Sequence, residues 1–337
     1  MRNDNIRFIL RKHIRRVIIR IRKWVRQNRK TAAYGAIILA VVLVSTLLLG
    51  VGSAVQKGQK QAGGDPDSAA EKLEEKKEQS IEKLKEEDAQ IQKVLASDKE
   101  YGAELGELYK EYPQMRKLFL NREAYPDWLL DYFITHKEAV DWVVDYPEYA
   151  GKTEEEIEAA AMTDADPEEY FEQNGIPLYL QWDKTWGYAP YGSGVIAVDG
   201  CGPTCLAMVV TGLTGDATMT PKKVADFSMQ NGFFAEGAGT SWSLMDEGAR
   251  KLGVRSRQME TWTAGAVINE LKAGHPMICS MGPGDFTEQG HFIVLCGISD
   301  DGKVILNDPN SRVNSRKEWD VQELLDQMKA MWSFQPK

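Results

Sequence analysis

Three side chains in the C-terminal half of the sequence have the chemistry of a thiol hydrolase. Cys201 lies in the segment Gly200-Cys201-Gly202-Pro203, His291 begins an apolar run, and Asp308 ends the next apolar run. A thiol can attack a carbonyl carbon, an imidazole can move the proton, and a carboxylate can orient the imidazole. Because these roles depend on one another, we interpret the three residues as a Cys-His-Asp triad.

The residues around Cys201 predict a turn that leads into a helix. Gly-Cys-Gly is a flexible turn, Pro203 suits a first helical turn, and Leu-Ala-Met-Val-Val then reads as an apolar helix interior. A thiol at a helix start is favoured as thiolate by the helix dipole and by the unpaired N–H groups. Cys205 lies one turn further along, and we expect it to be a core residue.

His291 and Asp308 are expected to meet on a β-hairpin. Asp301-Gly302 separates the apolar run 291–298 from the apolar run 303–307, which is a strong hairpin signal. A two-residue turn pairs Asp308 with Leu295, and a four-residue turn pairs it with Ile293. Both registers place His291 and Asp308 on the same face of the sheet, and a wider loop or a bulge would bring them closer.

The same segments resemble the C-39-like papain-superfamily peptidases of Gram-positive bacteria, relatives of the peptidases that trim bacteriocin leaders after a double glycine. The resemblance covers roughly residues 176–336 and rests on Ile176-Pro177, Gln181-Trp182-Asp183, Trp186-Gly187, the run from Asp199 to Met208, Gly239-Thr240-Ser241-Trp242-Ser243, Gly290-His291-Phe292 and Asn307-Asp308-Pro309. It implies an α+β, papain-like fold in which the helix carrying the nucleophile packs on an antiparallel sheet. It also implies Cys201 as nucleophile, His291 as base and Asp308 as orienting acid.

The resemblance implies further site residues around the triad. Gln181 corresponds to the glutamine that helps to stabilise the oxyanion, with the backbone N–H of Cys201 as the second donor. The loop that contains Gly239, Thr240, Ser241 and Trp242 is a candidate wall of the substrate cleft, although Trp242 is equally well explained as a core residue. We expect no metal ion and no cofactor. The double-glycine cleavage of the leader-trimming relatives is not expected here, because the sequence has no nucleotide-binding loop.

Three functions remain open at the level of sequence. The first is a cysteine peptidase that hydrolyses peptide bonds. The second is a cell-wall hydrolase on the same fold, which cuts the peptides of peptidoglycan. The third is a non-catalytic surface binding module, which an intact Cys201, His291 and Asp308 argue against. A redox pair of Cys201 and Cys205 has awkward geometry on one helix, and we expect Cys279 and Cys296 to be buried free thiols.

The N-terminal part of the sequence predicts a membrane anchor. Residues 1–30 contain twelve Lys or Arg and a single acid, and residues 31–55 contain no charged residue. The uncharged stretch is longer than the apolar core of a cleavable signal and long enough to span a bilayer. The positive-inside rule then places residues 1–30 in the cytoplasm, as a basic amphipathic segment, and residues 56–337 outside the plasma membrane.

The segments between the span and the triad predict a charged spacer and a helical region. We expect a charged linker or helix over 56–100, a helical stalk or cap over 101–170, and the peptidase-like domain over 171–337. Asp127–Phe133 recurs as Asp141–Pro147, which predicts two short amphipathic helices, either a substrate-docking module or a cap packed on the next domain. We interpret His136, between them, as a surface or capping residue.

The charge of the chain bears on its partners. Its net charge is −9 although its first 30 residues are basic, so the outer part is strongly acidic. Nucleic-acid binding needs clustered Lys and Arg to neutralise phosphates, and we therefore expect none. The expected partners are a peptide or protein substrate outside the cell and the membrane, and the oligomeric state is left open.

Overall fold

A computed structural model describes residues 66–153, 155–157, 172–237, 239–260 and 262–337. The predicted basic segment 1–30 and the predicted membrane span 31–55 lie outside these ranges. Among the helices within these ranges, none combines the length and apolar character needed to cross a bilayer. Contacts between residues divide the chain into Met1–Lys83 and Leu84–Lys337, and the second of these is one compact unit.

The predicted charged spacer is a helix that is longer than its charged run. Helix α3 spans Pro66–Ser97, and it extends beyond the charged segment 71–90 on both sides. Its side chains are exposed over 74–86, including Ile81 and Leu84, whereas Ile91 is buried in the core of the compact unit. The end of α3 is therefore anchored by packing, while its middle is solvated on all sides within the described residues.

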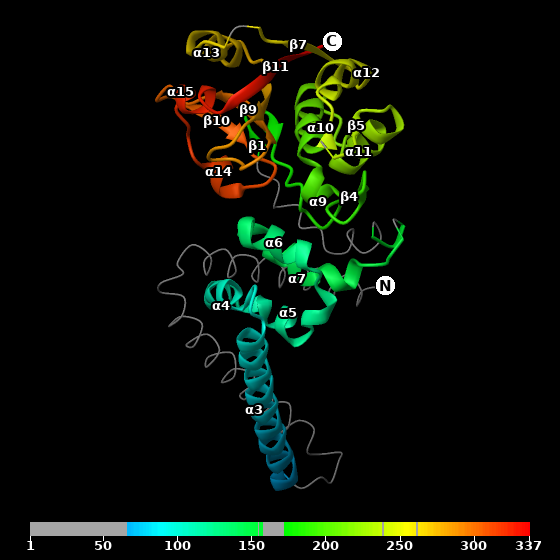
Figure 1. Ribbon diagram of the computed structural model, residues 1–337, viewed down its shortest axis with the longest axis vertical. Coiled ribbons are helices and arrows are strands. Elements are labelled where there is room, and N and C mark those ends of the chain that lie inside the picture. The colour runs from blue at the N-terminus through cyan, green and yellow to red at the C-terminus, as the bar shows by residue number, and fades with distance from the viewer. Residues whose placement is uncertain (1–65, 154, 158–171, 238, 261) are drawn as a thin grey trace, which may run out of the picture. The chain divides into compact units, whose positions relative to one another are not determined.

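Residues 102–149 form a group of short helices, here called the helical module (Figure 1). Its elements are α4 (Gly102–Glu111), η1 (Pro113–Met115), α5 (Arg116–Leu120), η2 (Arg122–Ala124), α6 (Asp127–Thr135), η3 (Lys137–Ala139) and α7 (Val140–Tyr149). The two helices predicted from the internal repeat are confirmed as α6 and α7. Pro147 lies in the last turn of α7 and does not end it, since the helix continues to Tyr149.

The C-terminal domain, residues 172–337, is an α+β fold. Its strands are β1 (Glu172–Gln173), β2 (Ile176–Pro177), β3 (Pro190–Tyr191), β4 (Gly194–Val195), β5 (Phe234–Ala235), β6 (Gly239–Thr240), β7 (Val254–Gln258), β8 (Met277–Met281), β9 (His291–Ile298), β10 (Val304–Asn307) and β11 (Met328–Pro336). Its helices are α9 (Ile196–Asp199), α10 (Cys201–Thr214), α11 (Pro221–Gln230), the π-helical turn η4 (Leu244–Gly248), α12 (Ala249–Lys251), α13 (Ala264–Lys272), α14 (Arg312–Arg316) and α15 (Val321–Leu325).

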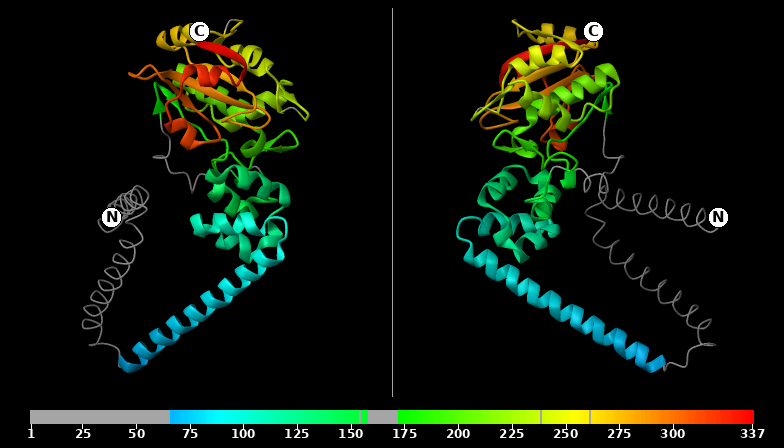
Figure 2. Two further views of the ribbon diagram at one scale, coloured as in Figure 1. Left: turned by 60° about the vertical axis from the view of Figure 1, so that its left-hand side comes forward. Right: turned by 90° about the vertical axis from the view of Figure 1, so that its right-hand side faces the viewer.

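The centre of this domain is a five-stranded antiparallel sheet in the order β10-β9-β8-β11-β7. Alternate residues of its strands enter two different cores, as the two-residue period of a strand requires. In β9, Phe292, Val294 and Cys296 belong to the larger core, which also contains the apolar residues of α10. Ile293 and Leu295 belong to a second core together with residues of α13 and α15. Figures 1 and 2 show α10 beside the sheet.

The hairpin of β9 and β10 differs in detail from both predicted turns. Ile298 pairs with Val304, so the turn contains five residues. Gly302 closes it with a φ of 76°, a conformation that glycine adopts without strain. A bulge between Ile305 and Leu306 then shifts the register by one residue, so that Asn307 pairs with Val294. The bulge restores the pairing register that a four-residue turn would have given. It thereby returns Asp308 to the same face of the sheet as His291.

The helical module packs against the C-terminal domain within the compact unit. The Tyr188 ring stacks on Trp142 and Tyr149 of α7, with ring centroids 5.2 and 4.1 Å apart. Tyr188 also donates a hydrogen bond to the carbonyl of Trp142. Lys184 forms an ion pair with Asp145. These stacked rings, the hydrogen bond and the ion pair hold the module against the sheet domain, so the two pack as one body.

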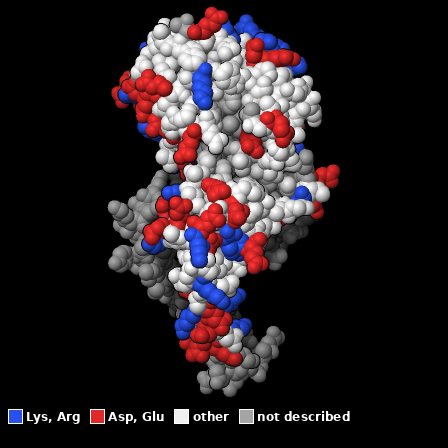
Figure 3. Space-filling model, viewed as in Figure 1, with Lys and Arg blue, Asp and Glu red and all other residues white. Residues whose placement is uncertain are grey.

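Charged side chains on the described surface are intermixed. In the face drawn in Figure 3, Asp and Glu alternate with Lys and Arg over the helices, and much of the C-terminal domain shows neither. Ion pairs such as Lys117–Asp145 and Arg122–Asp98 account for part of this mixing. On this face the described residues form no continuous basic surface that could follow a phosphate backbone.

Candidate active site

Cys201 is the first residue of helix α10, as its local sequence predicts. The turn before it depends on glycine because the backbone is crowded there. A Cβ on Gly200 would lie 2.5 Å from the carbonyl oxygen of Ile196, and one on Gly202 would lie 2.6 Å from the side chain of Thr240. Cys201 is partly exposed, unlike the other three cysteines. The thiol is therefore seated at a helix start, beside N–H groups that have no partner within the helix.

His291 and Asp308 are joined directly. Nε2 of His291 lies 2.8 Å from Oδ1 of Asp308, and both side chains are almost fully buried. Since a carboxylate only accepts hydrogen bonds, Nε2 carries the proton and Nδ1 is the ring nitrogen left for Cys201. The predicted proximity of these two residues on one sheet face is confirmed.

The environment of His291 favours the imidazolium form. Burial lowers the pKa of His291, but the charge and hydrogen bond of Asp308, together with the hydrogen bond and charge of Cys201, outweigh it and raise the pKa to about 10. A protonated imidazole beside a thiol is the arrangement that stabilises a thiolate. In the structure His291 thus contacts Asp308 directly, and Cys201 acts on the same imidazole ring.

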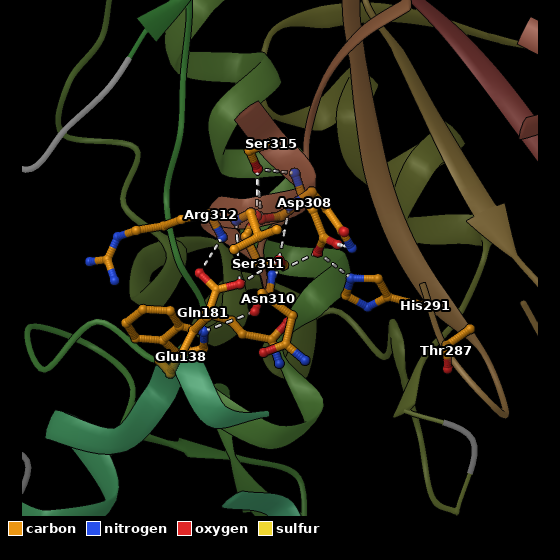
Figure 4. Close-up of polar contacts among 12 residues, drawn as sticks. Glu138, Gln181, Thr287, His291, Asp308, Asn310, Ser311, Arg312 and Ser315 are labelled. Atoms are coloured by element: carbon orange, nitrogen blue, oxygen red, sulfur yellow. Dashed lines mark hydrogen bonds and ion pairs between the residues drawn. The ribbon is translucent and has the colours of Figure 1, made fainter. Parts of the chain in front are cut away.

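The Asp308 carboxylate is held by donors on both of its oxygens (Figure 4). Oδ1 accepts from the backbone N–H of Asn310, and Oδ2 accepts from the side-chain amide of Asn314, each at 2.8 Å. The backbone N–H of Asp308 donates to Ser315 Oγ. A carboxylate that accepts three hydrogen bonds is restrained from rotating away from the imidazole, so the loop 308–315 helps to set the orientation of His291.

Gln181 is buried next to this loop, but its amide is engaged elsewhere. Nε2 donates to the carbonyl oxygens of Ala197, at 2.6 Å, and of Val198, at 3.3 Å. Its backbone N–H donates to the carbonyl of Pro309. Oε1 is buried without a hydrogen-bond partner among the described residues. In this conformation Gln181 links Ala197 and Val198, which precede Cys201, to Pro309, which follows Asp308. Its role as an oxyanion donor stays a prediction.

The loop predicted to line the cleft divides into a buried and an exposed part. Thr240 is buried, packs on Gly202 and shares a hydrogen bond with the Tyr191 hydroxyl at 2.9 Å. Trp242 is 46% exposed, with its ring against Trp332. The alternative that Trp242 is a core residue is therefore wrong. Gly239 precedes Thr240 and Ser241 lies between Thr240 and Trp242, and a role for the four in substrate binding remains a prediction.

Two residues of the helical module, Tyr132 and His136, lie near the triad, and the sequence singles out only His136, as a surface or capping residue. Tyr132 is buried, and burial followed by the charges of Asp308 and Cys201 raises the pKa of its hydroxyl. His136 stacks on Tyr132 with centroids 4.4 Å apart. Burial lowers the pKa of His136, and the nearby His291 acts in the same direction. His136 ends α6 as its C-cap, which agrees with the capping interpretation, and its side chain is half-buried beside Tyr132.

The remaining cysteines lie in the cores. Cys205, Cys279 and Cys296 are free and buried, as expected. Burial raises the pKa of each of these thiols. A buried thiol that resists ionisation is a poor nucleophile, whereas Cys201 is partly exposed. Over the described ranges, no group of three or more His, Cys, Asp or Glu is placed to hold a metal ion.

Comparison with known families agrees with this geometry. The model of the Peptidase_C39 like family matches residues 173–335. The C-terminal domain belongs to the C39-like peptidase family. The match includes helix α10, the sheet and the loop after β10, and it begins after the helical module. The resemblance predicted from the motifs is thus confirmed.

Two solved structures resemble this C39-like domain. The peptidase domain of Streptococcus ComA, a bifunctional ABC transporter in a quorum-sensing pathway, is 19% identical, with a TM-score of 0.32 and coverage of 42% of this chain and 93% of that chain. A putative C39-like peptidase from Bacillus anthracis is 17% identical, with a TM-score of 0.30 and coverage of 50% and 98%. A search of curated proteins finds no match.

Proposed function

We propose that this chain is a cysteine peptidase that hydrolyses peptide bonds with Cys201, His291 and Asp308. The observation that carries the proposal is the buried bond between His291 and Asp308 beside a thiol at a helix start. A histidine buried for packing alone has no need of a carboxylate held from both sides. The family of the C39-like domain supports the same chemistry.

The proposed reaction is acyl transfer to water in two steps. The Cys201 thiolate attacks the substrate carbonyl, and the Cys201 backbone N–H faces the developing oxyanion. The imidazolium of His291 gives its Nδ1 proton to the leaving amine, which leaves a thioester on Cys201. His291 then takes a proton from water, the hydroxide attacks the thioester, and the acid product leaves. Asp308 keeps the ring oriented throughout.

The proposed location is outside the plasma membrane, on a single anchor. This part of the proposal rests on the sequence, where a strongly basic segment precedes an uncharged stretch of 25 residues, Thr31 to Val55. Protease added to intact cells should then degrade epitopes placed beyond residue 56 and spare those before residue 30. Protection of the C39-like domain would contradict this location.

The substrate class is tested by comparing two materials. The purified chain is incubated with an unfolded protein and with purified cell wall, and released peptides are identified by mass spectrometry. We expect new termini in the unfolded protein, absent with Cys201→Ala. Release from the wall alone would favour a peptidoglycan hydrolase, and no Cys201-dependent release from either would favour a binding module.

A further inference from the structure

The helical module contacts the loop that holds Asp308, although the C39-like family match begins only at residue 173. Glu138 lies at η3, between α6 and α7, and its carboxylate faces the start of α14 (Figure 4). It accepts hydrogen bonds from the hydroxyl of Ser311, at 2.5 Å, and from the backbone N–H groups of Arg312, at 2.9 Å, and Val313, at 3.3 Å. Three donors from one loop thus converge on one carboxylate.

The hydrogen bonds of Ser311 connect Glu138 to Asp308, the proposed orienting acid. Ser311 gives its single hydroxyl proton to Glu138, so its oxygen is free to accept, and it accepts from the backbone N–H of Asn314 at 3.0 Å. The side chain of Asn314 donates to Oδ2 of Asp308. Ser311 also joins Ser315, whose hydroxyl receives the N–H of Asp308. Glu138 is therefore three hydrogen bonds away from the Asp308 carboxylate.

A second contact of the module reaches the same loop independently. The Tyr132 hydroxyl directs its single proton toward two acceptors, Oδ1 of Asn310 at 3.0 Å and the carbonyl of Ala197 at 2.9 Å. The backbone N–H of Asn310 donates to Oδ1 of Asp308, the oxygen that also receives His291. The module thus supports both oxygens of Asp308, one through Tyr132 and Asn310, the other through Glu138, Ser311 and Asn314.

We infer that Glu138 is a positioning residue for Asp308, and that the helical module is part of the peptidase instead of a spacer. This inference rests on the proposed function, in which Asp308 orients His291. Misplacing a reacting group by about 1 Å can cost on the order of 100-fold in rate. A loop that lost the carboxylate of Glu138 would leave three polar groups without their partner and would shift toward water.

The test compares three variants of the full chain. Glu138→Ala removes the acceptor, Glu138→Gln keeps one acceptor oxygen, and Glu107→Ala removes a carboxylate of the same module that bonds only to Lys110 in the described structure. We expect Glu138→Ala to lower kcat by roughly 10- to 100-fold with little change in KM. Glu138→Gln should restore part of this loss, and Glu107→Ala should match the unchanged chain.

Two further readouts separate positioning from a loss of folding. In an Asp308→Ala background, Glu138→Ala should lower kcat by less than about 2-fold, because the residue it acts through is gone. The pH profile of Cys201 alkylation by iodoacetamide should shift with Glu138→Ala and with Asp308→Ala in the same direction. An equal loss in both backgrounds, or an unshifted profile, would overturn the inference.

The alkylation profile also separates this inference from the proposed function. It reports the Cys201–His291 pair and needs no substrate. If the unchanged chain hydrolyses no peptide but Glu138→Ala still shifts the profile, the peptidase proposal fails and the positioning role of Glu138 stands. If peptides are hydrolysed and Glu138→Ala behaves like Glu107→Ala in every readout, the positioning role fails and the peptidase proposal stands.

Discussion

His291 Nε2 and Asp308 Oδ1 lie 2.8 Å apart, with only 6% and 2% of their side chains exposed. The two residues are 17 positions apart in sequence, at the ends of two neighbouring strands. Because the pair is shielded from water, the loss of one partner leaves an uncompensated buried charge, which destabilises the folded state. The pair is therefore coupled in stability as well as in chemistry, and substitutions at either position affect both.

The two cysteines of helix α10 should respond differently to substitution. Cys201→Ala should abolish hydrolysis and alkylation while leaving the fold intact, because the residue is partly exposed at the helix start. Cys205→Ser should keep activity but lower the free energy of unfolding by about 1–3 kcal/mol, since its hydroxyl is buried without an assured partner. Hydrolysis assays and urea unfolding measure the two effects. An inactive Cys205→Ser with an active Cys201→Ala would refute the nucleophile assignment.

Asp308→Asn should be less harmful than His291→Ala. An asparagine can keep its oxygen toward His291 and Asn310, and the amide of Asn314 can turn to accept from the new NH₂ group. We expect kcat/KM to fall by about 10- to 1000-fold in Asp308→Asn and to reach the level of Cys201→Ala in His291→Ala. Steady-state kinetics on one peptide substrate decides this, and equal losses in all three variants would exclude a purely orienting role for Asp308.

The raised pKa of His291 predicts how stability depends on pH. Its folded value, about 10, lies above its unfolded value, so protonation favours the folded state. The contribution is fully present below the unfolded value of about 6.5 and is lost as pH rises through about 10. The melting temperature should fall across this window, and less steeply in Asp308→Asn, where the main stabilising charge is gone. Parallel slopes in the two proteins would contradict the assigned cause.

Gly202→Ala should disturb the site through Thr240. The new Cβ would lie 2.6 Å from a buried side chain that is itself bonded to Tyr191, so the start of α10 must move. We expect a loss of about 1–3 kcal/mol in unfolding free energy and a reduced rate of hydrolysis. Gly265→Ala is the matched control, because a Cβ there meets nothing within 4 Å in helix α13. Identical behaviour of the two variants would show that the close contact is unimportant.

The triad residues were predictable because each has a local signal. Gly-Cys-Gly-Pro marks a helix start at Cys201. In a hairpin whose turn has an even number of residues, His291 and Asp308 lie on the same face of the sheet. The turn in the structure has five residues, and a bulge after Ile305 returns the two side chains to the same face. A bulge depends on the packing of both neighbouring strands, so the sequence of the hairpin does not reveal it.

The contribution of the helical module was not predictable in the same way. Glu138 and Ser311 are 173 positions apart, and neither segment carries a pattern that points to the other. The repeat at 127–147 does indicate two amphipathic helices, but periodicity shows only that each has an apolar face, not which surface covers it. Tyr132 and His136 acquire their place beside the triad only when the module packs on the C39-like domain.

The most direct test of the central claim is the labelling of the folded chain by a set of peptidyl acyloxymethyl ketones, mapped by mass spectrometry. These probes react with a cysteine that has been activated for attack on a peptide carbonyl. We predict a single adduct on Cys201, formed far faster than in the denatured chain and lost in His291→Ala. An adduct on another cysteine, or labelling of Cys201 no faster than in the denatured chain, would contradict it.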